Sequence, residues 1–259
     1  MPVITLTTDW NKNDYYLAAI KGLMIQTCPD TTIIDISHQI SSFNVVQAAF
    51  LIKNSYRHFP KGTIHIIGVN SASGPDTRFL GVSFEDQYFL SYDNGIFGLI
   101  FKDKPEEAIE IKTADNFSPV FPELTILAVA ACKIVKGITL KNLGEKVKYF
   151  ATTVPLRAAI DESVITGSVI YIDSYRNAIT NITRELFNRV GQNRNFEILI
   201  QSNHYRITRI NQTYGETTIG EILAIFNSIN LLEIAINRGN AADLLGLDTS
   251  SSIRIKFTK

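Results

Sequence analysis

Apolar positions follow two periods along the first half of the chain, and segments of the two kinds alternate. Short runs rich in β-branched residues have the length of strands, and longer segments carry apolar residues at helical spacing. The predicted strands cover residues 4–8, 31–36, 62–69, 79–84 and 88–90, and the predicted helices cover 15–24, 45–56 and 124–135. Strands that alternate with helices indicate a largely parallel sheet covered on both faces. We therefore predict an α/β N-terminal domain over residues 1–140.

The pattern changes near Lys141, after which helical spacing largely disappears. Strand-like segments separated by turns cover residues 156–165, 167–173, 195–202, 204–210 and 252–257, and only residues 218–226 could hold a short helical turn. Short strands of this kind are typical of a small barrel or sandwich. We predict a linker over residues 141–156 and a small C-terminal β-barrel domain over residues 157–259.

Composition and charge mainly exclude functions. The 259 residues are 45% hydrophobic, enough for one large core or two modest ones. Lysine plus arginine and aspartate plus glutamate both number 25, so nothing indicates a nucleic-acid or membrane partner. Cys28 and Cys132 are too few for a disulfide framework and have no metal-ligand spacing. Together with the absence of a recognisable signal segment, they lead us to expect a cytoplasmic protein without a metal site.

Asp9 is the first candidate for binding chemistry. It follows the first predicted strand, within a polar loop that leads into the helix beginning at Tyr15. Ligands of open α/β sheets bind beyond the carboxyl ends of strands, where a carboxylate could accept two hydrogen bonds from a sugar diol. The alternative is that Asp9 or Asp14 simply caps the helix, as aspartate often does.

Several short motifs occur in the order in which one known enzyme family carries them. They cover residues 6–9 with Asp14, 34–38, 59–65, 93–95, 171–173, 180–182, 213–214, 227–228 and 232–242. On these motifs the chain resembles the enzymes that cleave S-adenosylmethionine (SAM) at C5′ by nucleophilic displacement. That family contains the SAM hydroxide adenosyltransferases, or SAM hydrolases, and the halide-using fluorinases and chlorinases.

The resemblance implies an architecture and a ligand. It implies an N-terminal α/β domain, a smaller C-terminal β-barrel, and a homotrimer whose binding sites lie at subunit interfaces. The ligand would be SAM or another adenosine-containing small molecule, acting as substrate or ligand, and no cofactor is implied.

The resemblance also implies roles for individual residues. Asp9 would hold the ribose hydroxyls, and Asp14 would lie near the methionine part of the ligand. In the second half, Asp173 and Ser228 would hold the methionine amine and carboxylate. The adenine contacts would come from Asn177, Tyr214, Asn237 and the backbone near Gly239. Each of these residues also has an ordinary structural explanation, since Asp, Asn and Ser are common in turns and a tyrosine can belong to the core.

The resemblance breaks at the residues that activate water. Hydroxide-using members of the family carry an Asp, an Arg and a His, and the corresponding positions here are Asn70, Thr77 and Pro122. An amide can orient a water molecule but cannot take its proton. Arg78 adjoins the expected position, although a shift of one residue on a strand points a side chain to the other face. Asn70 and Arg78 are the catalytic candidates that remain, and His65 is expected to be a hydrogen-bonded core residue.

The halide-using members of the family suggest a different nucleophile pocket. Ser73 falls at its hydroxyl position and Phe43 at its aromatic position, whereas Asn70 replaces the second aromatic wall. Three functions therefore stay open. Hydrolysis of SAM to adenosine and methionine is the first, a non-catalytic SAM- or nucleoside-binding pseudoenzyme is the second, and a halide adenosyltransferase is the weakest of the three.

Overall fold

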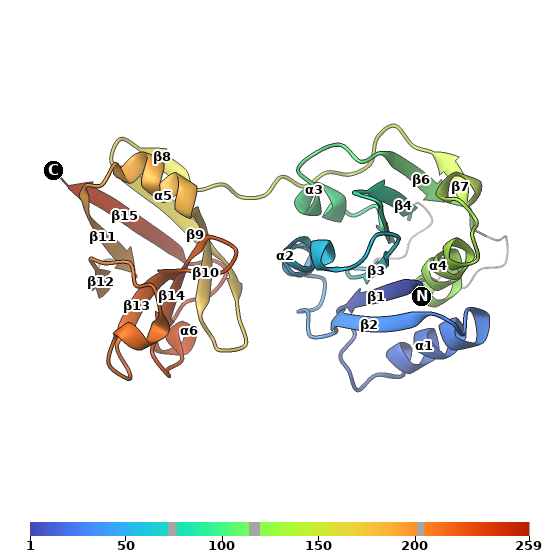
Figure 1. The fold of residues 1–259 in the computed structure, drawn as a ribbon, viewed down its shortest axis with the longest axis horizontal. Coiled ribbons are helices and arrows are strands. Elements are labelled where there is room, and N and C mark those ends of the chain that lie inside the picture. The colour runs from blue at the N-terminus through green and yellow to red at the C-terminus, as the bar shows by residue number, and fades with distance from the viewer. Residues whose placement is uncertain (72–76, 114–119, 201–204, 259) are drawn as a thin grey trace. The chain divides into compact units, whose positions relative to one another are not determined.

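The chain folds into two compact units. The structure, a computed structural model, describes residues 1–71, 77–113, 120–200 and 205–258. The units are Met1–Pro155 and Leu156–Lys259, and each has a sheet and a hydrophobic core of its own (Figure 1). We describe each unit by itself.

The first unit is built on a seven-stranded sheet. Its strands are β1 (Val3–Thr8), β2 (Thr32–Ser37), β3 (Ile64–Gly68), β4 (Phe79–Phe84), β5 (Gln87–Tyr92), β6 (Glu107–Ile111) and β7 (Gly144–Lys146), in the spatial order β2-β1-β3-β5-β4-β6-β7. The first four of these neighbours, β2, β1, β3 and β5, run parallel. The remaining pairs are antiparallel.

The sheet is therefore mixed, and the prediction of a largely parallel sheet needs correction. The cause lies in the connection between β4 and β5. Glu85 and Asp86 both have positive φ, at 51° and 59°, and form a two-residue turn. Such a turn joins antiparallel neighbours only, whereas parallel strands need a long crossover.

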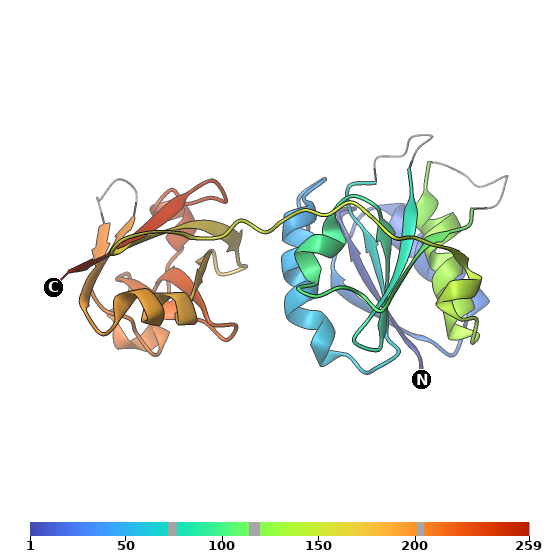
Figure 2. The same ribbon diagram turned by 90° about the horizontal axis from the view of Figure 1, so that it is seen from above.

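Helices cover both faces of this sheet, as Figure 2 shows. On one face lie α1 (Tyr15–Thr27), the π-helical turn η2 (Glu123–Leu127) and α4 (Ala128–Val135). On the other lie α2 (Val45–Ser55) and α3 (Ile96–Ile100), and the short 3-10 turns are η1 (Tyr56–His58) and η3 (Leu140–Asn142). No helix in the described part of the chain combines the length and the apolar character needed to cross a membrane.

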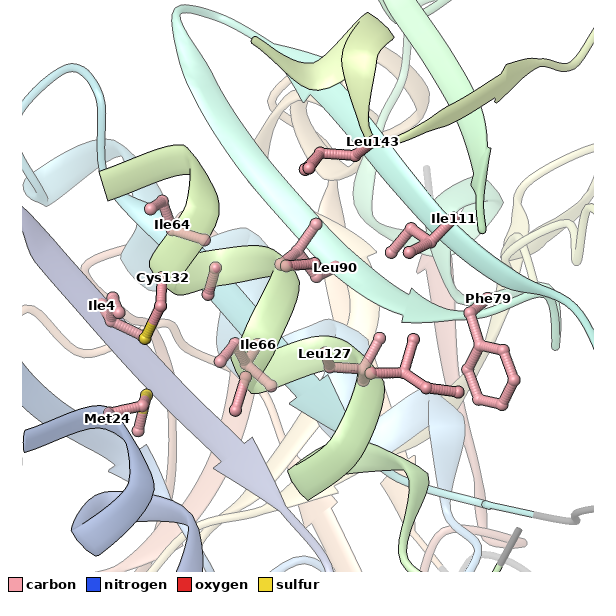
Figure 3. Close-up of a cluster of buried hydrophobic side chains, with 14 of the residues drawn as sticks. Ile4, Met24, Ile64, Ile66, Phe79, Leu90, Ile111, Leu127, Cys132 and Leu143 are labelled. Carbon is pink, nitrogen blue, oxygen red and sulfur yellow. The ribbon is translucent and has the colours of Figure 1, made fainter. Parts of the chain in front are cut away.

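The core under α1 and α4 contains both cysteines. Cys132 of α4 and Met24 of α1 point toward Ile4 of β1 in Figure 3, and Cys28 belongs to the same buried cluster. Both thiols are free and buried, so the cysteines pack as small apolar side chains.

The described part of the second unit contains eight strands. They are β8 (Ala159–Asp161), β9 (Val164–Ile172), β10 (Ala178–Thr183), β11 (Asn195–Ile200), β12 (Tyr205–Ile207), β13 (Ile222–Phe226), β14 (Leu231–Ile236) and β15 (Ser252–Thr258). The sheet order is β12-β11-β15-β9-β10-β14-β13, with β8 paired to β9. The end strands β12 and β13 touch, so the sheet is nearly barrel-shaped. Two helices, α5 (Arg184–Gly191) and α6 (Ala241–Leu244), and the turn η4 (Tyr214–Glu216) complete this unit.

Part of the second unit was predicted wrongly. Residues 222–226 form strand β13 instead of the predicted helical turn. The strand pairs with β14 along its whole length. Alternate residues Ala224 and Phe226 enter the main core, while Leu223 and Ile225 pack in a separate cluster on the other face. Since both faces are apolar, the sequence shows no period of two.

Gly144 gives a test of the β6–β7 pairing. It faces Ile111 in the register of the two strands, and a Cβ at this position would overlap the backbone carbonyl of Glu110. We predict that G144A lowers the stability of the first unit by about 1–3 kcal/mol, the range found for overpacked sites. Trp10, the only tryptophan, lies in this unit, so denaturant unfolding followed by tryptophan fluorescence measures the effect.

The matched control is G22A, in the interior of α1. A Cβ at Gly22 meets nothing within 4 Å, and replacing glycine by alanine inside a helix stabilises by roughly 0.5–1 kcal/mol. Equal unfolding midpoints for the two variants would contradict the close approach of β7 to β6.

Candidate functional site

The candidate site lies at the carboxyl ends of the parallel strands. From β1 the chain passes through α1 to β2 on one side, and then through α2 to β3 on the other side of β1. The strand order therefore reverses between β1 and β3. In open α/β sheets, ligands bind at such a point, beyond the carboxyl ends of the strands.

Asp9 directly follows β1 and is held by two backbone groups from distant loops. Its Oδ2 accepts hydrogen bonds from the N–H of Phe43, at 2.8 Å, and from the N–H of Asn70, at 3.2 Å. Both donors have positive φ, 67° and 54°, a conformation that residues other than glycine rarely adopt. Such backbone strain persists only where the surrounding structure imposes it, and it is concentrated at functional sites.

The capping alternative does not describe Asp9. Asp14 occupies the N-cap position of α1, and its side chain makes no capping hydrogen bond. Asp9 instead connects the loop after β1 to the loops that precede α2 and follow β3.

Glu123 is the second carboxyl group at this edge of the sheet. It is the first residue of η2 and only 2% exposed. A Cβ at Gly68, the last residue of β3, would lie 2.9 Å from Cγ of Glu123 and 3.1 Å from Cζ2 of Trp10. The missing side chain of Gly68 thus leaves room for Glu123 and Trp10 at the end of β3.

Aromatic rings enclose this region. Trp10 packs edge-to-face on Phe121, with ring centroids 5.2 Å apart, and lies 6.0 Å from the ring of Tyr16. Tyr16 in turn packs edge-to-face on Phe121. Trp10 shares the space over Gly68 with Glu123 and contributes apolar surface there.

The environment of Glu123 raises the pKa of its carboxyl group. Burial raises the pKa of the Glu123 carboxyl, and the negative charge of Asp9 raises it further. Tyr92, at the end of β5, and Ser71 oppose the shift. Neither Tyr92 Oη nor Glu123 Oε1 has a well-aligned hydrogen-bond partner among the described residues, although both atoms are buried. Burial also raises the pKa of Tyr92, so its hydroxyl stays protonated.

The two catalytic candidates from the sequence have different surroundings. Asn70 lies in the site, where its backbone N–H binds Asp9. Arg78 forms two ion pairs instead, from Nη1 to Asp93 Oδ2 and from Nε to Glu110 Oε2, each at 2.9 Å. These ion pairs give Arg78 a structural role, because they connect different strands of the sheet. Ser73 lies outside the described residues.

The buried histidines belong to the structural framework. His65 Nδ1 lies 2.7 Å from Thr5 Oγ1, and its Nε2 lies 2.6 Å from Gln87 Oε1, which confirms the predicted hydrogen-bonded core residue. Burial lowers the pKa of His65 to about 4, so the ring is neutral. His38 is also buried, with Nδ1 2.8 Å from Thr8 Oγ1 and Nε2 3.1 Å from Asp35 Oδ1.

In the second unit, Asp173 and Asn177 form one hydrogen-bonded turn. Asp173 Oδ1 accepts from the backbone N–H of Asn177 at 2.8 Å, and Oδ2 accepts from its side-chain amide at 3.2 Å. Arg176 has a positive φ of 65° within this turn. The turn lies between β9 and β10 and joins the two residues that the resemblance assigns to ligand binding.

Near this turn, a buried acid is fixed by two side chains. Glu233 of β14 is 2% exposed, and its carboxylate accepts from Tyr214 Oη at 2.7 Å and from Asn227 Nδ2 at 3.2 Å. Burial raises the pKa of Glu233, and the charge of Asp173 adds to the shift. Asp173 also raises the pKa of Tyr214, so the turn and this cluster are electrostatic neighbours. Ser228, which follows Asn227, is exposed.

Asn237 and Gly239 shape the loop after β14. Asn237 donates from Nδ2 to the carbonyl of Thr217 at 2.6 Å, and its backbone bonds to Gly220 and Glu221. The N–H of Gly239 donates to the carbonyl of Ile236 at 2.9 Å. A Cβ at Gly239 would overlap the side chain of Ile236, so this tight turn requires glycine.

Comparison with known proteins gives the family. Residues 4–144 match the model of the SAM hydroxide adenosyltransferase N-terminal domain, and residues 167–254 match that of the C-terminal domain. The chain belongs to the SAM hydroxide adenosyltransferase family. The two matches cover most of both units and confirm the resemblance read from the sequence motifs.

Relatives of this family member share about a quarter of its residues. An (R)-S-adenosyl-L-methionine hydrolase of Thermus thermophilus is 25% identical, over 98% of this chain and 100% of the relative. A fluorinase of Actinopolyspora mzabensis is 24% identical, over 98% and 97%. The fold is shared with an uncharacterized conserved protein from Thermotoga maritima, with a TM-score of 0.89 and 24% identity, covering 99% and 100% of the two chains.

Glu123 and Glu233 were not among the site residues predicted from the sequence. Glu123 stands at the start of a helix, where an acidic residue is ordinary because it offsets the helix dipole. Glu233 interrupts an apolar strand, and that interruption was the one available signal. A charged residue within an apolar strand is buried at a cost unless it is paired, so it marks a site worth testing.

The raised pKa of Glu123 predicts a pH-dependent stability. The folded state disfavours the ionised carboxylate, so the wild type loses stability as the pH rises from the ordinary glutamate pKa of about 4.3 through the higher folded value. E123Q lacks this titration. We predict that E123Q melts higher than the wild type at pH 8 and that the difference shrinks toward pH 4. Thermal unfolding followed by Trp10 fluorescence checks this, and a difference independent of pH would contradict it.

Proposed function

We propose that this chain binds SAM and hydrolyses it at C5′ to adenosine and methionine, with Asp9 holding the ribose. The observation that carries the proposal is the fixed position of Asp9 at the strand-order reversal. Hydrogen bonds from the described residues reach only Oδ2 of its carboxylate. Oδ1 is left for a ligand, and a carboxylate readily accepts bonds from a pair of neighbouring hydroxyls.

The family supports this choice of ligand and reaction. The matching relatives include proteins named (R)-S-adenosyl-L-methionine hydrolase and fluorinase, each similar to nearly the whole of this chain. Of these two activities, hydrolysis is the one that the residues of this chain fit better. Asn70 replaces an aromatic wall of the halide pocket with a polar amide, which suits a water molecule better than a desolvated halide ion.

The reaction balances without a cofactor. A water oxygen bonds to C5′ while the C5′–S bond breaks, and the electron pair of that bond stays on sulfur. The sulfonium is already an activated leaving group, because it becomes a neutral thioether. Positioning the water and C5′ in line can then supply much of the rate. One proton leaves the attacking water.

The second unit carries the other half of the proposed site. In the proposed homotrimer, Asp173 and Ser228 of a neighbouring copy hold the methionine amine and carboxylate. Asn177, Tyr214, Asn237 and the backbone at Gly239 contact the adenine, and Asp14 lies near the methionine. The hydrogen bonds that fix Asp173 and Tyr214 support this assignment, since a fixed group loses little entropy on binding.

A non-catalytic SAM binder is the second candidate function. Two observations favour it: Asn70 replaces a carboxylate in the family pattern, and the guanidinium of Arg78 is already paired with Asp93 and Glu110. Such a protein would sense or sequester the nucleoside.

The deciding experiment is incubation of the purified protein with SAM, with and without chloride. Products are followed by mass detection, and binding is measured by calorimetry. Adenosine and methionine above a no-protein control support hydrolysis, and a 5′-chloro product supports halide transfer. Binding without product favours the non-catalytic binder. If the protein shows neither binding nor product, the proposal is overturned.

Substitution of Asp9 is the most direct test of the proposed SAM-binding site. D9A removes a charged acceptor, and a hydrogen bond to a charged group contributes about 1.5–3 kcal/mol. We therefore predict that the Kd for SAM rises by roughly 10- to 100-fold or more, measured by calorimetry. D86N is the control, because Asp86 is an exposed carboxylate whose side chain pairs with Lys61, and asparagine also tolerates the positive φ of this turn. Near-normal affinity of D9A would show that the ribose site is elsewhere.

A further inference from the structure

We propose that Glu123 accepts the proton of the attacking water, an inference that rests on the proposed hydrolysis. Glu123 lies at the start of η2, beside the end of β3 and close enough to Asp9 for their charges to interact. The candidate ribose carboxylate and this buried acid therefore converge at one edge of the sheet, from different elements.

The burial of Glu123 is the first argument. A buried carboxyl oxygen without a hydrogen-bond partner is costly, and buried polar atoms in native proteins are nearly always paired. Oε1 of Glu123 has no partner among the described residues, and the residue is 2% exposed. The other buried acid, Glu233, has both Tyr214 and Asn227 as donors. Of these two buried glutamates, Glu123 is the one with a carboxyl oxygen that lacks a well-aligned partner, which fits a reactive role.

The space around Glu123 is the second argument. Gly68 ends β3 without a side chain, and a Cβ there would come within 2.9 Å of Glu123 Cγ. The carboxyl group therefore reaches over the end of the strand whose loop carries Asn70. Asn70 can orient a water but cannot accept its proton, so a nearby carboxylate completes the chemistry.

Charge balance is the third argument. Bound SAM would bring a positive sulfonium into a site that holds Asp9 and Glu123, and a nearby cation favours the ionised form of a carboxyl group. When the C5′–S bond breaks, the electron pair neutralises the sulfur. The carboxylate loses its cationic neighbour at the same moment and takes the proton of the water. Sulfonium and carboxylate become thioether and carboxylic acid, so this pair of opposite charges is neutralised together in a site of low polarity and the charge of Asp9 is unchanged.

The groups that face Glu123 set its basicity. Asp9 and burial raise the pKa of the carboxyl, while Tyr92 and Ser71 lower it, and Trp10 contributes apolar surface. A base is most effective when its pKa lies near the working pH, so a raised value suits this role better than an ordinary glutamate does.

The test is E123Q in the full-length protein, with SAM as substrate. Removal of a general base typically costs about 10²–10⁴ in rate. We expect kcat to fall at least ~100-fold, a larger loss than the weakening of the calorimetric Kd for SAM that removal of a carboxylate near the sulfonium causes. E85Q is the matched control, because Glu85 is an exposed glutamate paired with Arg57, and its activity should equal that of the wild type.

The pH profile separates a proton acceptor from a structural residue. For the wild type, kcat/KM should fall toward acid with an apparent pKa above the ordinary glutamate value, and E123Q should lose that limb. E123D should recover part of the rate. If E123Q fails to fold, the wild-type profile decides alone, and a flat profile between pH 5 and 8 overturns the proposal.

The outcomes distinguish this proposal from the proposed function. If the wild type hydrolyses SAM and E123Q does so equally fast, Glu123 is not the proton acceptor and hydrolysis stands. If the wild type binds SAM without turnover, hydrolysis fails and the role of Glu123 fails with it.

Discussion

One carboxylate oxygen, Asp9 Oδ2, connects the three loops that make the candidate site. It receives the N–H of Phe43 and the N–H of Asn70, and each donor adopts a φ that costs energy outside glycine. The parallel pairing of β1 with β3 brings Asp9 and the loop after Gly68 side by side. The sheet therefore brings the loops of the site together, and the hydrogen bonds of Asp9 fix the conformation of those loops relative to its carboxylate. A ligand would meet a prepared carboxylate, which lowers the entropy cost of binding.

Each unit contains one buried glutamate near its candidate binding residues, and the two glutamates differ in the hydrogen bonding of their carboxyl groups. Glu233 is paired with Tyr214 and Asn227, so its carboxylate is held and its charge is shared. Glu123 lies among aromatic and apolar groups, with Oε1 unpaired by any described residue. The first arrangement fixes the positions of Tyr214 and Asn227. The second stores an unfavourable burial that a cationic ligand would relieve, and that is a property of reactive groups.

The sequence predicted the elements whose apolar period is clear. β1, α1, α2 and the helix through α4 lie close to their predicted ranges, because each presents buried residues to a core. β2 also lies close to its predicted range, although none of its residues is fully buried. The mixed sheet was missed, since direction depends on the turn at Glu85 and Asp86 rather than on the strands. β13 was missed because both of its faces are apolar. Asp9 could be selected from its place after a strand, whereas Glu123 is special only through tertiary burial.

The neutral residue at position 70 and the acid at position 123 make physical sense together. With Asp9 and Glu123 already at this edge, a third carboxylate on Asn70 would bring another like charge close by. That charge would raise the pKa of Glu123 further and keep it protonated, so it could not accept a proton. An amide at residue 70 avoids this repulsion and still can orient water. Under the proposed role of Glu123, the departure from the acidic pattern corresponds to a proton acceptor at the start of η2 instead of in the loop after β3.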